Sequence, residues 1–191
     1  MLLIDDPFTP KTAGARDLLE SARALPGQVE RLLAGPAGRF AGALDAFEAG
    51  RRRGEPLGLG SMIALASYYD EAAGWLERLA AGQETVDHTD AFFANEVVLR
   101  LAGSLRSIMA ALLASADEGV VLEEQMFRRL YRRLVWTFRA EVTSFERKKY
   151  ISLSHEPNKA MNLNSYIGLM GGSYREVHTV GDRPGHRGRR G

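Results

Sequence analysis

Four arginines in the second half of the sequence have the spacing that gathers basic side chains along one helix. Arg128 and Arg132 are four residues apart, and so are Arg129 and Arg133. Residues four apart are neighbours on the surface of a helix. The planar guanidinium group of arginine binds phosphate through two parallel hydrogen bonds and also stacks on bases. The spacing therefore predicts an arginine band suited to the backbone of a nucleic acid.

The basic character continues beyond this band. Arg139 follows Arg132 by seven residues, and the run Arg147–Lys149 comes later on the same expected helix. Residues 171–191 are rich in glycine and arginine, which is typical of a flexible tail that follows single-stranded nucleic acid. The residues predicted to contact nucleic acid are Arg128, Arg129, Arg132, Arg133, Arg139, Arg147, Lys148, Lys149, Arg183, Arg187, Arg189 and Arg190.

A simpler interpretation of the same charges stays open. Glu123 and Glu124 stand at the start of the expected helix and Arg147–Lys149 at its end, an order that complements the helix dipole. The arginine band can then be a solvated helix face with no ligand. The tail can likewise be a terminus that only keeps the chain soluble.

The formal charge of +1 over 191 residues hides a strong asymmetry. Residues 1–120 carry 11 basic and 17 acidic side chains, whereas residues 121–191 carry 14 basic and 7 acidic ones. Such asymmetry indicates a partner that prefers one end of the chain. The acidic part of one copy can also meet the basic part of another, so we expect self-association or other protein subunits as partners.

Signatures of catalysis are missing from the sequence. Without cysteine, thiolate metal sites and cysteine nucleophiles are excluded. None of the four histidines follows a glutamate by three residues, as a di-iron helical bundle would need. The glycine-rich phosphate-binding motifs, the H-E-x-x-H zinc motif and the G-x-S-x-G nucleophile motif are also missing. We therefore expect a protein that is not an enzyme, with no catalytic residue, metal or cofactor.

Targeting signals are equally sparse. The first ten residues begin with a short apolar run that includes Leu2–Ile4 and is followed by two aspartates, and this run is too short for a signal peptide. The most apolar stretch, 97–113, is interrupted by Arg100 and Arg106. We therefore expect a cytoplasmic protein that does not interact with membranes.

The composition favours helices because alanine, leucine and arginine dominate and β-branched residues are few. Apolar periodicity predicts helices over 12–25, 26–33, 37–49, 61–81, 87–114, 121–150 and 159–169, with breaks at Pro26-Gly27 and Gly35-Pro36. The predicted fold is an all-α bundle of five to six helices, without a sheet. Residues 1–170 would form a single domain, followed by the tail 171–191.

The helix expected over 121–150 has the clearest pattern. Its apolar residues are spaced as the face of one continuous helix requires: Phe127, Tyr131, Leu134, Phe138, Val142 and Phe145. Thirty helical residues would be about 45 Å long and would carry the whole basic run.

Three classes of function fit these features. The first is a non-enzymatic subunit that binds the backbone of RNA or single-stranded DNA; it is similar in general kind to the small all-α subunits of CRISPR effector complexes, a likeness of fold only. The second is a cargo or adaptor protein, because Thr179–Arg183 resembles the Thr-Val-Gly core of encapsulin targeting peptides. The third, a helical-bundle enzyme, has the least support.

Overall fold

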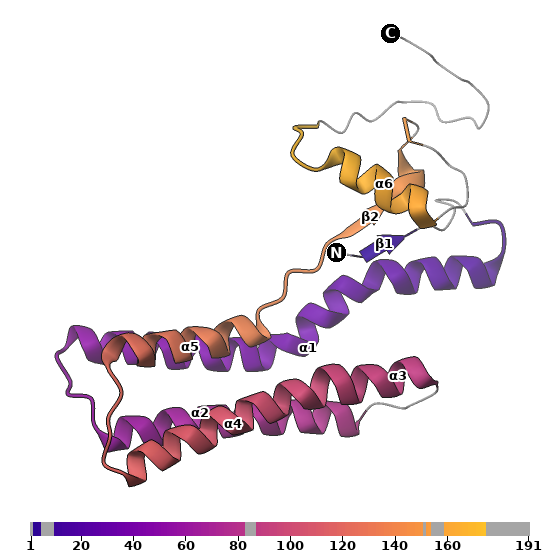
Figure 1. The fold of residues 1–191 in the computed structure, drawn as a ribbon. Helices are drawn as coiled ribbons and strands as arrows, with labels where there is room; N and C mark the ends of the chain where they lie inside the picture. Colours follow the sequence, from indigo (N-terminus) through magenta and orange to yellow (C-terminus); the bar gives the residue numbers. More distant parts are fainter. Residues whose placement is uncertain (1, 5–9, 83–86, 151, 154–158, 175–191) are drawn as a thin grey trace. The chain divides into compact units, whose positions relative to one another are not determined.

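The computed structural model describes residues 2–4, 10–82, 87–150, 152–153 and 159–174. The chain divides into two compact units, Ala24–Val142 and a second one that joins Met1–Arg23 to Thr143–Gly191. The described residues are overwhelmingly helical, which confirms the all-α fold class (Figure 1). Helix α1 (Ala13–Arg52) contributes to both units.

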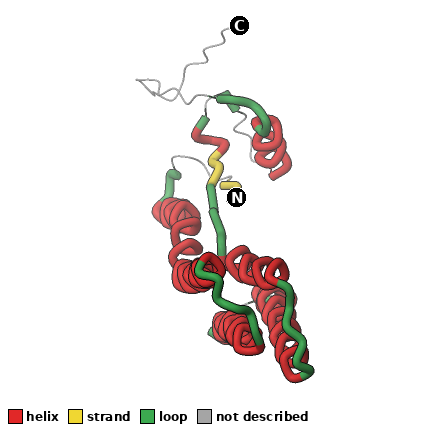
Figure 2. Tube along the Cα trace, turned by 90° about the vertical axis from the view of Figure 1, so that its left-hand side faces the viewer, coloured by secondary structure: helices red, strands yellow, loops and turns green. Residues whose placement is uncertain are grey.

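The larger unit, Ala24–Val142, contains most of the helices. After α1 come α2 (Leu59–Ala81), α3 (His88–Phe92), a π-helical segment (Phe93–Leu99), α4 (Arg100–Asp117) and α5 (Glu124–Phe138). The stretch from α3 to α4 runs beside α2 (Figures 1 and 2). The expected helices over 61–81 and 87–114 are therefore confirmed, although the π-helical segment was not foreseen.

The core of this unit joins apolar faces from four helices. Met62, Leu65 and Tyr69 of α2 are fully buried, as are Leu105 of α4 and Phe127 of α5. Rings from α1 stack on rings from α5, with centroids 5.0 Å apart for Phe40 and Phe138 and 4.8 Å apart for Phe47 and Tyr131. The inner face of α5 is thus fixed by aromatic packing against α1.

The breaks expected at Pro26 and Pro36 are wrong. Both prolines lie inside α1, which is helical from Ala13 to Arg52. A proline removes one N–H from the helical ladder and is accommodated by a kink, at a local cost in stability. Phe40 and Ala43 are buried in the core on the C-terminal side of both prolines. Packing of this kind offsets what the prolines cost.

The thirty-residue helix expected over 121–150 is also wrong. Helix α5 ends at Phe138, and Arg139 has an extended backbone with φ −83° and ψ 112°. The chain then forms β2 (Ser144–Glu146), which pairs in parallel with β1 (Leu2–Ile4) and contradicts the expectation of no sheet. The β-branched pair Val142-Thr143 precedes this strand and favours extended backbone.

The smaller unit is built around this two-stranded sheet. Lys159–Leu169 forms α6, as expected, and Phe145 packs against Tyr166 of that helix with ring centroids 5.6 Å apart. Phe145 therefore belongs to the apolar pattern of 121–150 in the sequence, but it packs in the smaller unit and not with the other residues of that pattern. Within the same unit, Arg23 binds both carboxylate oxygens of Glu146, at 2.9 and 2.6 Å.

The helical stretch His88–Asp117 is long and apolar enough to span a membrane by length and composition. Ala102, Leu105 and Leu112 of this stretch are buried in the core, although only 22% of its most apolar window is buried. Asp87 caps the start of this stretch, since its carboxylate accepts hydrogen bonds from the backbone N–H groups of Thr89 and Asp90.

Candidate nucleic-acid interface

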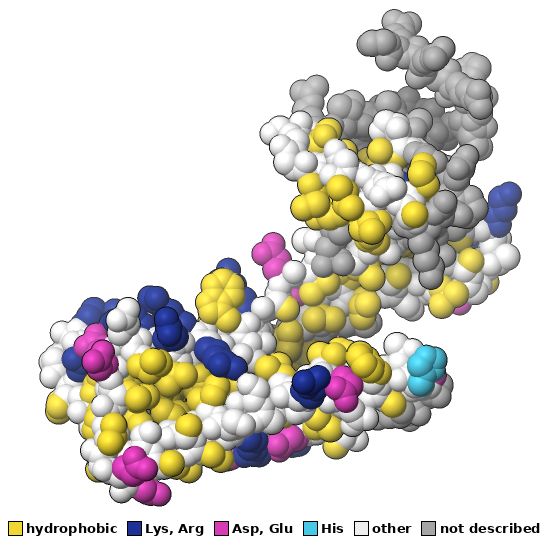
Figure 3. All heavy atoms as spheres, in the orientation of Figure 1, with side chains coloured by type: hydrophobic (Ala, Val, Ile, Leu, Met, Phe, Trp, Pro, Cys, Tyr) yellow, Lys and Arg dark blue, Asp and Glu magenta, His cyan; other side chains and the backbone are white. Residues whose placement is uncertain are grey.

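An open groove of about 730 Å³ runs along the solvent-facing side of α5. Lys and Arg side chains gather over this helix in Figure 3. The lining residues are Glu124, Gln125, Arg128, Arg129, Arg132, Arg133 and Trp136. The four arginines predicted from their spacing therefore share one surface, which we call the α5 groove.

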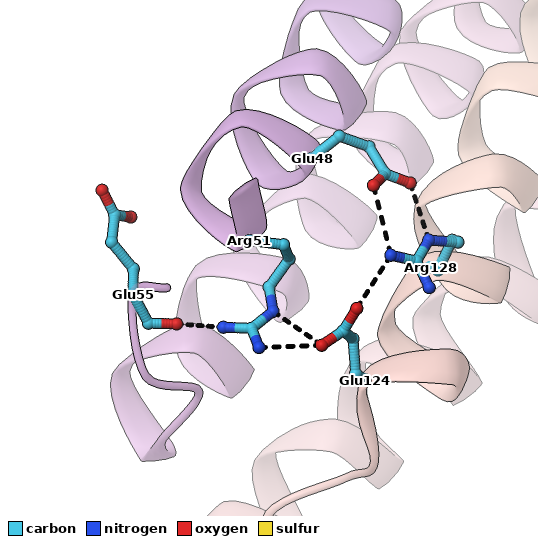
Figure 4. A network of polar contacts seen from close by, with 5 residues as sticks. All are labelled: Glu48, Arg51, Glu55, Glu124 and Arg128. Carbon is cyan, nitrogen blue, oxygen red and sulfur yellow. Dashed lines mark hydrogen bonds and ion pairs between the residues drawn. The ribbon is translucent and has the colours of Figure 1, made fainter. Parts of the chain in front are cut away.

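One of these arginines is neutralised by carboxylates. Arg128 donates from Nε to Glu48 Oε1 at 2.7 Å and from Nη2 to Glu124 Oε1 at 2.8 Å (Figure 4). Arg51 donates from Nε to the other oxygen of Glu124, at 2.9 Å. These four side chains form an alternating network that ties the end of α1 to the start of α5. Arg128 belongs to that network and holds the start of α5 against the end of α1.

The network changes the acidity of its members. Hydrogen bonding from Arg128 lowers the pKa of Glu48 below its ordinary value. The pKa of Glu124 is lowered by hydrogen bonds from Arg51 first and from Arg128 second. Hydrogen bonding to Glu48 and then Glu124 raises the pKa of Arg128, so its charge is permanent. Both carboxylates are ionised at neutral pH and cancel positive charge at this edge of the groove.

The other three arginines make no ion pair among the described residues, although the charge of Arg132 helps to lower the pKa of Glu48. Arg129 and Arg132 are exposed, and no carboxylate among the described residues lies within ion-pair distance of either one. Arg133 is also exposed and donates from Nη2 to the Ser104 hydroxyl at 3.0 Å. A hydroxyl carries no charge, so this contact orients Arg133 without neutralising it.

Trp136 completes the α5 groove and was not predicted as a site residue. It is 67% exposed, and the Arg139 guanidinium lies 5.2 Å from the centroid of its ring. Its position in the sequence could have indicated this role. Trp136 falls outside the apolar pattern of α5, and it lies four residues after Arg132, which makes the two residues neighbours on the helix surface. Arg139 joins the site through this ring, from a position beyond the helix end.

The predicted run Arg147–Lys149 does not continue α5. It forms a short 3-10 helix in the smaller unit, and Arg147 is fully buried there. Arg147 is therefore removed from the predicted contact surface. Lys149 lies against Tyr150, with its Nζ 5.6 Å from the ring centroid. The described residues do not include the contact residues of the predicted basic tail or the segment that resembles a targeting peptide, which are Arg183, Arg187, Arg189, Arg190 and Thr179–Arg183.

A second concave surface, of about 470 Å³, lies between α2 and α4. Its carboxylates are paired: Arg106 binds Asp70 and donates from Nη2 to Glu77 at 2.8 Å. Among the described residues, no group of three His, Asp or Glu side chains could hold a metal ion. This surface therefore shows an ion-pair cluster between two helices.

Comparison with known proteins identified no relative. No family model matches the chain, and neither curated proteins nor solved structures gave a significant match. The function is therefore argued from the geometry of the α5 groove.

Proposed function

We propose that this protein is a non-enzymatic binding subunit that holds the phosphate backbone of RNA or single-stranded DNA in the α5 groove. The observation that carries the proposal is the set Arg129, Arg132 and Arg133, exposed on one helix face with no carboxylate partner among the described residues. Glu124 and Glu48 lie at one edge of this surface and pair with Arg128, so the ion pairs at that edge leave these three guanidinium groups without a carboxylate of the described residues in hydrogen-bond contact.

Phosphate is the ligand that this chemistry recognises best. Each guanidinium offers several N–H donors in a planar fork, which matches two phosphate oxygens at once. Binding releases the counterions condensed on the nucleic acid, so affinity falls steeply as salt rises. The acidic first part of the chain would face other protein subunits or another copy, because it repels a phosphate backbone.

The test compares two triple charge reversals with the same change in net charge. Arg129→Glu, Arg132→Glu and Arg133→Glu together alter the groove, while Arg16→Glu, Arg31→Glu and Arg100→Glu together alter exposed arginines elsewhere. Binding is measured by fluorescence anisotropy with labelled single strands of RNA and DNA, each of about twenty nucleotides. Circular dichroism of all three proteins verifies that they fold.

We expect the groove variant to lose affinity on the order of 100-fold at about 50 mM salt, and the control variant to lose only a few-fold. Equal losses in the two variants would mean that net charge alone attracts the strand, and the groove would not be the site. No binding by the unaltered protein at this low salt would overturn the proposed function altogether.

A further inference from the structure

We infer that Trp136 stacks on an unpaired base and makes the α5 groove selective for single strands over duplexes. This inference rests on the proposed function, because it assigns a second contact to the same groove. The arginines of the groove recognise the phosphate backbone, which is common to both forms of nucleic acid. The indole would recognise a base face, which only an unpaired base presents.

The position of Trp136 separates it from the core. Its neighbours Leu134 and Phe138 are fully buried on the inner face of α5, whereas Trp136 is 67% exposed. Burying a large aromatic side chain is favourable, so an exposed tryptophan gains nothing from folding. Its indole nevertheless lines the same groove as the unpaired arginines. The residue is thus presented on the surface where the ligand would lie.

The register places backbone and base contacts in sequence along the helix. Trp136 follows Arg132 by four residues and Arg133 by three, so it lies one helical turn, about 5.4 Å, farther along the same face. A strand held at its phosphates by Arg132 or Arg133 would therefore bring its next base to the indole. Aromatic side chains that follow basic ones in this way are typical of proteins that bind single strands.

Arg139 supports this role from beyond the end of the helix. Its backbone has turned to an extended conformation, and its guanidinium lies 5.2 Å from the centre of the Trp136 ring. A cation at this distance is attracted to the electron-rich face of an indole. The contact restricts the orientation of the ring and places one more positive charge beside a stacked base. Even with Arg139 in contact, most of the Trp136 surface is open to solvent.

A duplex presents few accessible base faces for stacking on Trp136. Its bases are paired and stacked on each other, and removing one from the stack costs several kcal/mol before any contact with the protein is made. A single strand presents base faces without that cost, and stacking on an aromatic ring tolerates every base. The indole should therefore strengthen binding to single strands with little preference for sequence.

The first measurement compares Trp136→Ala and Trp136→Phe with the unaltered protein, on a single strand and on a duplex of the same sequence and length. We expect Trp136→Ala to weaken single-strand binding about 10-fold or more and duplex binding less than about 2-fold. Trp136→Phe should retain part of the selectivity, because a smaller ring still stacks. The slope of affinity against salt should stay the same in both variants, since no phosphate contact is removed.

The second measurement uses fluorescence. Trp75, the other tryptophan, packs against Phe138 in the core, with centroids 5.4 Å apart and an edge-on geometry. In the variant Trp75→Phe, Trp136 is the sole tryptophan and reports directly on the groove. Saturating single strand should quench its emission, and a saturating duplex should leave it nearly unchanged.

The outcomes distinguish the inference from the proposed function. Binding of single strand and duplex with equal affinity, unaffected by Trp136→Ala, would overturn stacking and leave backbone binding by the arginines intact. A loss of both ligands in Trp136→Ala with a normal circular dichroism spectrum would also overturn selectivity. No binding of either ligand by the unaltered protein would be a failure of the proposed function.

Discussion

Two adjacent arginines of α5 have opposite surroundings. Arg128 lies between the carboxylates of Glu48 and Glu124, whereas Arg129 has no such partner among the described residues. The two faces of the helix also differ, because the inner face carries Phe127, which is fully buried, and the outer face carries the exposed Trp136. One helix thus separates a packing surface from a surface that is open to a ligand.

The difference between the two arginines comes partly from α1. Glu124 of α5 and Glu48 of α1 both pair with Arg128. Glu48 lies near the end of α1, 80 residues before Arg128 in the sequence, and reaches it only because the two helices pack together. Its carboxylate helps to cancel the charge of one guanidinium in the groove. The contact surface of α5 is therefore defined partly by which of its arginines α1 neutralises.

The largest effect should come from the inner face. Phe127→Ala removes a fully buried ring whose centroid lies 6.1 Å from that of Phe47, and we expect it to lower the free energy of unfolding by about 3–5 kcal/mol. Gln125→Ala, an exposed change on the same helix, should alter it by no more than about 0.5 kcal/mol. Urea unfolding followed by circular dichroism measures both. Similar decreases in the free energy of unfolding for the two variants would show that the inner face of α5 is packed no more tightly than the outer face.

A smaller pair of effects compares adjacent arginines. Arg129→Ala should reduce the slope of log affinity against log salt by about 0.7 on a single strand, with no change in melting temperature. Arg128→Ala should lower the melting temperature by a few degrees and leave that slope unchanged, because Arg128 is already paired. Thermal melts and salt titrations of both proteins measure the two quantities. A reduced salt slope in Arg128→Ala would mean that the network opens when nucleic acid binds.

Local patterns in the sequence predicted much of the fold. The helices over 61–81, 87–114 and 159–169 follow from apolar periodicity, which acts within a few residues. The prolines of α1 and the end of α5 could not be predicted in this way. Pro36 lies inside α1, which packs into the core through Phe40. Phe145 fits the apolar spacing of a helix over 121–150, but it lies in a strand and packs against Tyr166 of α6.

The candidate site was predicted to a similar extent. The spacing of Arg128, Arg129, Arg132 and Arg133 identified the surface, because helical neighbours are set by local geometry. It could not show that Glu48 neutralises Arg128, since that contact depends on tertiary packing. The apolar pattern of α5 did not point to Trp136, because that pattern marks the residues of the core and Trp136 lies outside it on the exposed face.

The smallest effect is a dependence on pH that also separates Arg128 from Arg129. The lowered pKa values of Glu48 and Glu124 mean that the folded chain favours their ionised forms. The stability that they contribute is therefore complete above their ordinary pKa of 4.5 and is lost as pH falls through the lower values of the folded state.

Low pH should therefore reduce the loss of stability caused by Arg128→Ala, whereas Arg129→Ala should have little effect on stability at any pH. We expect the difference in melting temperature between the unaltered protein and Arg128→Ala to stay constant from about pH 6 down to about pH 4.5 and to shrink below that pH, because protonated carboxyl groups no longer pair with the guanidinium. The corresponding difference for Arg129→Ala should stay near zero across that range. A constant difference for Arg128→Ala would indicate that Arg128 stabilises α5 through the packing of its side-chain stem, without a contribution from its charge.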